Sequence, residues 1–473
     1  MNTENKETQI EFSERLAEQY DNDVSVLDEV NESTEANLCS DGLGQNKSPV
    51  ITRPTSIEET GLSTEFIASL VGKHLYDGGV LTISQLVQRL GLAGSIIETV
   101  LQFLRKEARI EVRSRELVND SVSVGLRYAL TDLGRSLAME SLAKDGYLGA
   151  APVPLEQYRE VVMAQSVHYC KVTQGSIRTA FSNVVLKESL LDKLGPAVTS
   201  GRAIFIYGPA GTGKTYITQR LTRLFTDSCL IPHAISINEA IVPVFDPILH
   251  KILDNEQGQP ELMLDQGDDP RFVRCARPLV ISGGELTIDM LNVRFDKDTK
   301  LYHAPLQLKA NNGLFIIDDM GRQRVSPAEI FNRWIVPLEE RKDFLSLGDG
   351  RHFDVPFDEV LVFSSNINPL ELADEAFLRR IGYKIHFGHL TDQEYSIIWQ
   401  QECDKLGIAF NIDVLNFVLY ELHKRDSIPL LPCHPRDLLN IAHDQVRYLC
   451  DDEGIGMEAI SWAWENYFVQ LEE

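Results

Sequence analysis

The chain is 473 residues long, which is more than one hydrophobic core ordinarily organises, so two or three domains are expected. Its formal net charge is −25 and 43% of its residues are hydrophobic, a composition typical of globular proteins. Nucleic acids and anionic membranes attract basic surfaces, so this charge argues against broad, nonspecific binding to either. At most a local basic patch is expected.

The N-terminus and the apolar runs predict a cytoplasmic protein without a membrane span. The first residues, MNTENKETQ, lack the charged and then apolar pattern of a signal peptide. No run approaches the roughly 18 to 20 apolar residues of a spanning helix. The seven cysteines contain no CxxC pair, and we interpret them as reduced thiols.

The first segment, residues 1–60, is strongly acidic, with fourteen Asp or Glu and four Lys or Arg. Few large apolar residues interrupt it, so it cannot bury enough surface to offset the entropy cost of ordering. We therefore predict a disordered acidic tail. The alternative is a short partner-binding helix over Ile10 to Tyr20.

Residues 61–150 have the pattern of a small α+β domain that begins with three helices. The first is predicted over Thr64 to Leu75, and the next two are joined at Gly91 and Gly94. Apolar side chains at helical spacing predict the buried faces of these two helices, namely Leu86, Val87 and Leu90, followed by Ile96, Ile97, Val100, Leu101 and Leu104.

Two strands and a further helix complete this domain. The strands are predicted over Ala108 to Arg113 and Ser123 to Leu130, and Thr131 is predicted to cap the helix. This order of elements resembles a winged-helix domain. The segment holds ten basic and ten acidic residues, and Glu98 lies on its second helix, which is a poor footprint for phosphates. We favour docking to a protein over DNA reading, which stays open.

A phosphate-binding loop comes next in the chain. Residues 151–195 predict a Pro-marked connection and helical lead-in, and Ala203 to Tyr207 predicts a buried strand. The strand leads into GPAGTGKT and an amphipathic helix, the pattern of a P-loop, whose backbone N–H groups surround phosphates. Lys214 is predicted to reach the β- and γ-phosphates, and Thr215 to offer its hydroxyl to Mg²⁺. The predicted ATP-binding residues are Gly208, Pro209, Ala210, Gly211, Thr212, Gly213, Lys214, Thr215 and Tyr216.

Further along the chain, GLFIIDDM over Gly313 to Met320 predicts another buried strand, which ends in two carboxylates. Asp318 is predicted to hold Mg²⁺ through water, together with the Thr215 hydroxyl. Asp319 is predicted to polarise the attacking water. An acidic pair is common at strand ends, but its position after the P-loop lysine indicates nucleotide hydrolysis.

Four further motifs give residues 170–450 a resemblance to the AAA+ ATPases: LVFSSN, EAFLRRIGYKI, CHPRDLL and DFLSLGDGRHFDVPF. The first is similar to the family's sensor 1 strand, which implies that Asn366 orients the lytic water. The second is similar to the arginine-finger segment, which implies that Arg380, ahead of Arg379, reaches the ATP of a neighbouring subunit. The third places Arg436 where the sensor 2 arginine of the lid normally stands.

The fourth motif looks like the inserted β-hairpin of the subgroup that includes magnesium chelatases, MoxR-type ATPases and bacterial enhancer-binding activators. The resemblance implies a doubly wound parallel-sheet α/β core over residues 196–390 and a C-terminal helical lid over 391–473. It also implies ATP and Mg²⁺ as ligands, and a homo-oligomer, expected to be a hexamer. Such a ring ATPase would remodel or assemble an unidentified protein substrate or adaptor.

One departure from the family concerns the second acidic position, where most active members have Glu and this chain has Asp319. Displacing a catalytic group by an ångström can cost on the order of a hundredfold in rate. We therefore expect ATP binding to be unaffected, and hydrolysis to be slow or to need assembly. Two rival functions remain open: a DNA-linked regulatory ATPase, and a nucleotide-gated scaffold with negligible turnover.

Residues 241–310 form a long segment between the two nucleotide motifs. The stretch DNEQGQPELMLDQGDDPR within it predicts a surface excursion. The segment is interpreted either as a family insertion that contacts substrate or as a solvated loop. In the helix after the acidic pair, Trp334 has core spacing and is predicted to pack rather than to bind a ligand.

Overall fold

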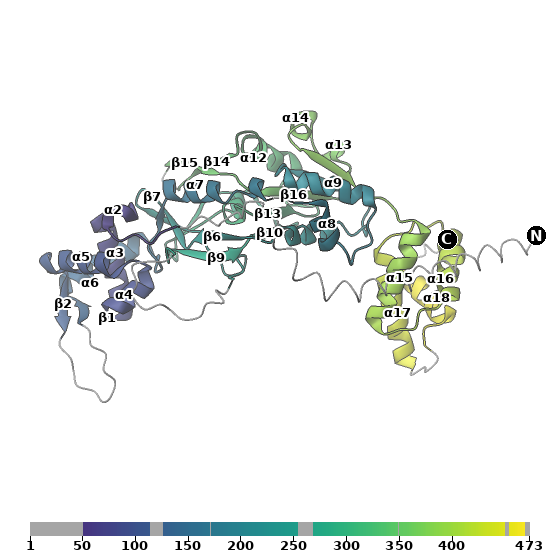
Figure 1. Ribbon diagram of the computed structural model, residues 1–473, viewed down its shortest axis with the longest axis horizontal. Helices are drawn as coiled ribbons and strands as arrows, with labels where there is room; N and C mark the ends of the chain where they lie inside the picture. The colour runs from purple at the N-terminus through teal and green to yellow at the C-terminus, as the bar shows by residue number, and fades with distance from the viewer. Residues whose placement is uncertain are drawn as a thin grey trace, which may run out of the picture. The chain divides into compact units, whose positions relative to one another are not determined.

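The computed structural model describes residues 51–113, 126–170, 172–253, 268–348, 350–449 and 454–468 (Figure 1). They belong to one compact unit, Ser48–Glu473. Most of the predicted acidic tail, the alternative helix over Ile10 to Tyr20 and the start of the strand predicted from Ser123 lie outside the described residues. Within the described part of the chain, no helix is both long and apolar enough to cross a bilayer.

The N-terminal module contains three helices, a three-stranded antiparallel sheet and a final helix. Its elements are α3 (Thr64–Gly78), β1 (Val80–Thr82), α4 (Ile83–Leu90), α5 (Gly94–Lys106), β2 (Ile110–Arg113), β3 (Arg127–Leu130) and α6 (Asp132–Lys144). The strands pair in the order β1-β3-β2. Of the eight predicted core side chains, seven are buried and Val87 is partly buried. The Thr131 hydroxyl accepts from the Gly134 N–H, which confirms the predicted cap.

The folded region begins before residue 61, where the composition placed the end of the tail. Ser56 caps a short helix, α2 (Ile57–Thr60), and the Thr60 side chain is fully buried. Arg53 donates to the Leu92 carbonyl at 2.7 Å, so residues outside the helix are also held. Composition averaged over sixty residues does not register such contacts between distant parts of the chain.

A buried ion pair ties this region to the segment between the two nucleotide motifs. The side chains of Arg271 and Asp269 are both 0% exposed, and their closest N–O distance is 2.8 Å. Arg271 also donates to the Thr60 carbonyl and to the Gln157 side chain. The Arg271 N–H groups thus find oxygen acceptors, which offset the cost of burying the guanidinium. Removing either Arg271 or Asp269 would leave the charge of the other buried and unpaired.

The central sheet has five parallel strands in the order β10-β13-β16-β5-β17. Their bounds are β10 (Leu279–Ser282), β13 (Leu314–Ile317), β16 (Val360–Ser365), β5 (Ile204–Tyr207) and β17 (Tyr383–His386). Because the strands are parallel, their carboxyl ends lie at one edge. The strand that precedes the P-loop and the strand that precedes the acidic pair are therefore separated by β16.

Apolar side chains of these strands alternate between two hydrophobic clusters, one on each face of the sheet. Ile204, Ile316 and Val362 belong to the cluster that includes residues of α8 (Gln174–Ala180), α9 (Glu188–Thr199) and α10 (Lys214–Arg220). The opposite cluster includes residues of α12 (Pro327–Glu340) and α14 (Glu375–Leu378). Helices therefore cover both faces, as expected for a doubly wound α/β core. Trp334 is fully buried there, which confirms the packing prediction.

The segment 241–310 is folded wherever the structure describes it, so the solvated-loop interpretation is wrong for these residues. β6 (Ser228–Pro232) pairs with β9 (Phe272–Ala276), and β7 (Ala234–Ile237) pairs with β4 (Val153–Pro154) and β8 (Ala240–Pro243). Further elements are η3 (Ile288–Leu291), β11 (Arg294–Asp296), β12 (Leu301–His303) and α11 (Leu306–Ala310). The stretch 254–267, which holds most of the predicted excursion, lies outside the described residues.

The predicted inserted hairpin is present as β14 (Lys342–Ser346) paired antiparallel with β15 (His352–Pro356). The lead-in to the core is helical in part, with α7 (Leu155–Ala164) and η1 (Val167–Tyr169). The short elements η2 (Leu221–Leu224) and α13 (Pro369–Leu372) complete the core.

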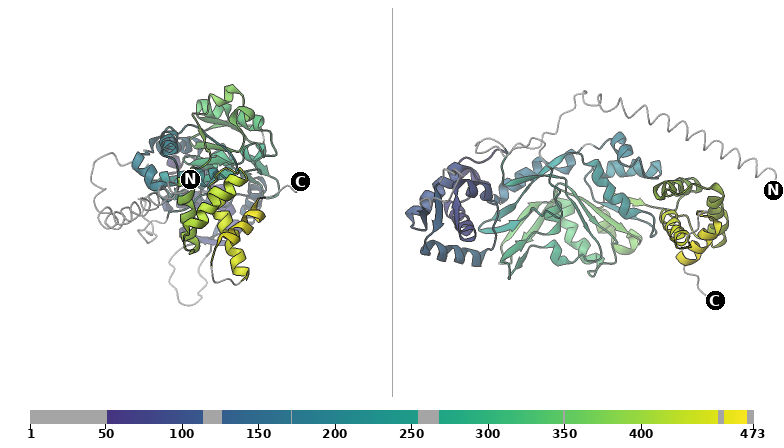
Figure 2. Two further views of the ribbon diagram at one scale, coloured as in Figure 1. Left: turned by 90° about the vertical axis from the view of Figure 1, so that its right-hand side faces the viewer. Right: turned by 90° about the horizontal axis from the view of Figure 1, so that it is seen from below.

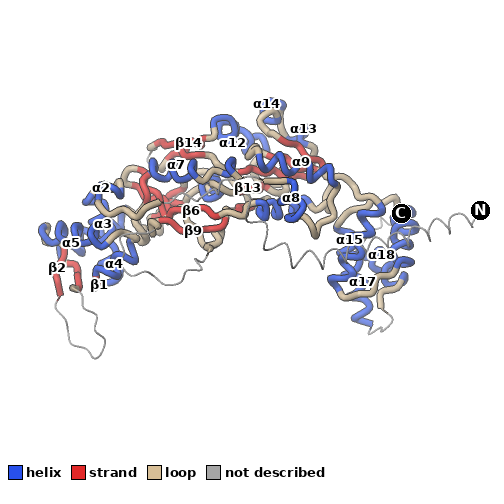
Figure 3. Tube along the Cα trace, in the orientation of Figure 1, coloured by secondary structure: helices blue, strands red, loops and turns tan. Residues whose placement is uncertain are grey.

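The C-terminal segment is helical in every element described (Figure 3). It contains α15 (Asp392–Leu406), α16 (Ile412–Asn416), the π-helical turn η4 (Phe417–His423), α17 (Cys433–Leu449) and α18 (Met457–Tyr467), which are green to yellow in Figure 2. Thr391 begins the first helix with a capping box closed by Glu394. These helices share a hydrophobic cluster that is separate from those of the sheet and includes the buried Trp399 and Trp464.

The loop between β15 and β16 buries an acidic side chain. Glu359 is 4% exposed, and neither of its carboxyl oxygens has a hydrogen-bond partner among the described residues. Burial, and then the nearby Asp343 and Asp358 carboxylates, raise the pKa of Glu359 well above its usual range. At pH values between the unfolded and the folded pKa, Glu359 therefore keeps a proton in the folded protein that it releases in the unfolded chain.

We predict that Glu359→Gln makes stability less dependent on pH. The amide stays neutral, whereas wild type loses up to about 1.4 kcal/mol per pH unit once the unfolded carboxyl ionises and the folded one does not. Urea midpoints measured between about pH 5 and pH 8 should diverge in favour of the variant as pH rises. Parallel curves would contradict the prediction.

Candidate active site

The loop between β5 and α10 has a backbone that requires glycine. Gly208, Gly211 and Gly213 have φ of 149°, 82° and 79°, a region that other residues rarely adopt. A Cβ at Gly208 would lie 2.0 Å from the Phe387 carbonyl oxygen, so the loop passes directly against the chain that follows β17. The predicted succession of strand, glycine loop and helix is confirmed, with α10 beginning at Lys214.

The Lys214 side chain is folded back over this loop. Its ammonium donates to the Gly208 carbonyl at 2.9 Å, the Pro209 carbonyl at 2.8 Å and the Asn366 side-chain oxygen at 2.6 Å. These acceptors are uncharged. Burial lowers the pKa of Lys214, and the nearby Asp318 and Asp319 oppose that shift. A buried ammonium with neutral partners is placed to exchange them for an anion.

The acidic pair follows β13 and contacts the first turn of α10. The Thr215 hydroxyl donates to Asp318 Oδ2 at 2.6 Å. A hydroxyl and a carboxylate oxygen are hard ligands of the kind that Mg²⁺ takes, and Mg²⁺ usually keeps several waters beside one or two carboxylates. The two residues predicted to hold the metal are therefore adjacent, and their chemistry fits that ion.

Asn366, directly after β16, connects the loop to the second carboxylate. Its side-chain oxygen accepts from Lys214, and its side-chain N–H donates to Asp319 Oδ1 at 3.3 Å. This connection follows from the strand order, because β16 lies between the strands that carry the other groups. We call Lys214, Thr215, Asp318, Asp319 and Asn366 the polar cluster.

Asp319 has a left-handed backbone, with φ of 50°. Asp and Asn adopt this conformation more readily than other residues with a Cβ. The neighbouring Met320 N–H donates to the Ser364 carbonyl at 2.8 Å, which ties the turn to β16. The second carboxylate is thus carried by a tight, irregular turn.

Gln323 belongs to the same turn, and the sequence analysis missed it. Its side-chain N–H₂ group lies 3.0 Å from the Asp318 carbonyl and 3.3 Å from the Asp319 carbonyl, and its oxygen accepts from the Gly321 N–H at 2.8 Å. A glutamine in a polar stretch carries no motif. Only the glycine next to Met320, a turn signal, could have drawn attention to this stretch.

The three predicted arginines are not in contact with the polar cluster in the described interactions. Arg380 donates to Glu339 at 2.9 Å and to the Ala376 carbonyl at 2.7 Å. Arg379 is exposed at the end of α14. Arg436 pairs with Asp437, and its side chain is 62% exposed.

The remaining predicted loop residues are exposed or support the loop. Pro209 and Ala210 are exposed at its tip, and the Thr212 hydroxyl donates to the Pro209 carbonyl at 2.9 Å. Tyr216 is 47% exposed, and its ring lies under the Arg220 guanidinium at 4.3 Å. Tyr216 therefore contacts its own helix rather than the polar cluster.

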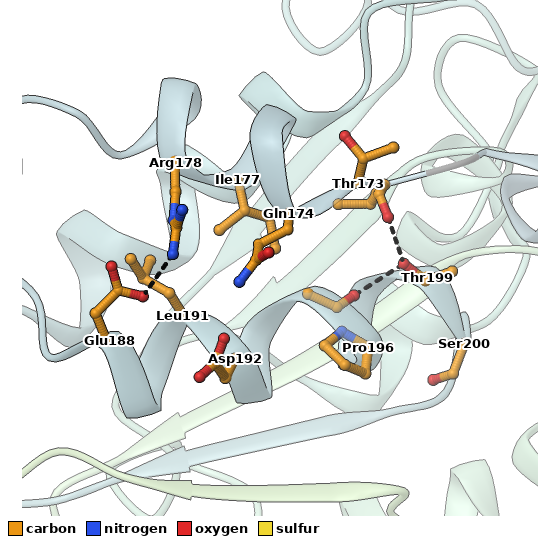
Figure 4. A pocket seen from close by; sticks show the side chains of 12 residues that line it. Thr173, Gln174, Ile177, Arg178, Glu188, Leu191, Asp192, Pro196, Thr199 and Ser200 are labelled. Carbon is orange, nitrogen blue, oxygen red and sulfur yellow. Dashed lines mark hydrogen bonds and ion pairs between the residues drawn. The ribbon is translucent and has the colours of Figure 1, made fainter.

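A cavity of about 520 Å³ lies between α8 and α9 (Figure 4). Ile177 and Leu191 line it, and the Arg178–Glu188 ion pair, with an N–O distance of 3.4 Å, crosses from one helix to the other. Its lining includes no residue of the polar cluster. The cavity is therefore separate from the candidate site.

We predict that Gly208→Ala destabilises the protein more than Gly213→Ala. Both positions have positive φ, which strains alanine, but only the Cβ at residue 208 overlaps another backbone. Urea unfolding of both variants should show a free-energy loss at 208 that exceeds the loss at 213. Equal losses would contradict the loop geometry.

The chain was compared with known proteins. Residues 391–466 match a family described as "Domain of unknown function (DUF8689)". No curated protein matches the chain. Among solved structures, the RuvB Holliday junction branch migration motor of Thermotoga maritima is 12% identical, with 62% of this chain and 70% of that chain covered and a TM-score of 0.33.

A mutant of the same RuvB is 11% identical over 62% of this chain and 70% of that chain, with a TM-score of 0.34. NtrX from Brucella abortus is 12% identical over 63% of this chain and 55% of that chain, with a TM-score of 0.37. At such TM-scores none of these similarities carries a functional argument. Function is therefore inferred from the polar cluster.

Proposed function

We propose that the protein binds ATP with Mg²⁺ and hydrolyses it, as an ATPase of the AAA+ type. One observation carries this proposal: the polar cluster joins a glycine loop, a lysine, a hydroxyl, two carboxylates and an amide at adjacent carboxyl ends of β5, β16 and β13. Parallel α/β sheets bind ligands in the crevice at this edge. A lysine, Mg²⁺ ligands and a base in one place are the groups that phosphoryl transfer to water requires.

The residues divide the work between binding and hydrolysis. The loop N–H groups and the start of α10 would hold the phosphates, and Lys214 would leave its carbonyl acceptors for the β- and γ-oxygens. Thr215 and Asp318 would hold Mg²⁺, which neutralises charge on the phosphates when bound. Asp319 would accept the proton of the attacking water, with Asn366 orienting that water.

The proposal extends to assembly and to a partner. Because its segment resembles an arginine finger, we propose that Arg380 acts on the ATP of a neighbouring copy in a hexameric ring. In the described structure it pairs with Glu339 of its own chain and lies outside the polar cluster. A finger supplied in this way contributes on the order of 10³ to 10⁵ in rate. We propose that the C-terminal helices form the lid, and that Arg436 on α17 contacts the bound nucleotide from there.

The ring would remodel or assemble a protein partner, recruited by the N-terminal module.

We expect wild type to release phosphate from ATP with a specific rate that rises with protein concentration, because an active site completed by a neighbour needs assembly. Lys214→Ala should lose binding and release, since the phosphates lose their buried cation. Lys193→Ala, an exposed lysine on α9, is the matched control. Equally slow release by wild type and Lys214→Ala at every concentration would refute the proposal.

A nucleotide-gated scaffold is the second candidate, because Asp319 has a shorter side chain than the usual Glu. Asp319→Asn separates the two candidates, since it removes the base but keeps the size and the left-handed backbone. For the ATPase, we predict that kcat falls about 10²- to 10⁴-fold while the Kd for ATP is nearly unchanged. For the scaffold, wild type and variant would bind ATP alike and release no phosphate.

A further inference from the structure

We propose that Gln323 is a positioning residue for Asp319, holding the turn that carries this carboxylate against the end of β10; the inference rests on the proposed ATPase. Gln323 touches no carboxylate oxygen of the polar cluster in the contacts described. Its amide contacts backbone alone. Any effect on the reaction would therefore pass through the position of the turn.

One side chain makes four contacts there. Its oxygen accepts from the Gly321 N–H at 2.8 Å. Its N–H₂ group points to three carbonyl oxygens, those of Asp318 at 3.0 Å, Asp319 at 3.3 Å and Gly283 at 3.3 Å. Gly283 directly follows β10, so the amide links the acidic turn to the neighbouring strand.

The turn needs such a link because its backbone is irregular. Asp319 and Gly321 both have positive φ, 50° and 102°, so their peptide groups leave the ladder of the sheet. On the β16 side the turn is held by the Met320 N–H and by the Ser365 hydroxyl, which donates to the Met320 carbonyl at 2.7 Å. On the β10 side the Asp318 N–H donates to the Ser282 carbonyl at 2.8 Å, and Gln323 adds the link for the residues that follow Asp318.

Both anchors bear on the distance between Asp319 and Asn366. Their side-chain contact is 3.3 Å, long enough for a small movement of the turn to break it. A displacement of about 1 Å at a catalytic group can cost on the order of a hundredfold in rate. Nucleotide binding depends mainly on the loop and Lys214, which Gln323 does not contact in the described interactions. Its one contact with Asp318 is to the backbone carbonyl and not to the carboxylate that would hold Mg²⁺.

The test compares Gln323→Ala and Gln323→Glu with wild type. The glutamate keeps the shape but replaces the donor with an oxygen that faces three carbonyls. We expect kcat to fall about 10- to 100-fold in both variants, with the Kd for ATP within about twofold. Arg324→Ala, an exposed neighbour, is the control that should change neither quantity.

A second readout is independent of hydrolysis. In Gln323→Ala the Gly321 N–H loses its acceptor, so one more amide of the peptide around residues 318–324 should exchange rapidly. Exchange of the loop at 208–213 should stay unchanged. Unchanged kcat in an active enzyme, or unchanged exchange, would overturn the inference, as would a joint loss of kcat and ATP binding. If wild type shows no Lys214-dependent release, the proposed ATPase fails, and the exchange result alone decides whether Gln323 holds the turn.

Discussion

The hydrogen bond between the Lys214 ammonium and the Asn366 amide, 2.6 Å long, joins parts of the chain that are distant in sequence. It exists because β16 lies between β5 and β13, so an asparagine at its end faces the loop on one side and the acidic turn on the other. Any phosphate that draws the lysine away also frees the amide that contacts Asp319. If the loop binds phosphate as proposed, the strand order would couple that binding to the surroundings of the second carboxylate.

Much of this site was predictable because its signals are local. GPAGTGKT, the apolar run before Asp318 and the apolar run before Asn366 each specify a strand and the polar group at its carboxyl end. Trp334 and the hairpin β14–β15 were also read correctly, from spacing and from motif. The contacts among these motifs could not be derived from composition or periodicity, because they depend on which strands become neighbours.

The parts that the sequence left open or did not indicate depend on contacts formed only in the folded chain. Asp269 and Arg271 stand at the end of the predicted polar excursion, but their ion pair is fully buried because Arg271 also donates to the distant Thr60 and Gln157. β6 and β9 are separated by a long stretch of chain and meet only in the folded protein, so alternation alone could not pair them. Gln323 shows the same difficulty at smaller scale, since its role comes from carbonyls that an irregular turn exposes.

The hydrophobic core of the N-terminal module extends beyond the module itself. Its hydrophobic cluster also includes Ala151, Ala234 of β7 and Ile241 of β8, and Leu301 of β12 packs against it. A chain cut after residue 150 would leave apolar surface uncovered on both pieces. We therefore expect the module and these strands to unfold together, although the sequence places them in separate segments.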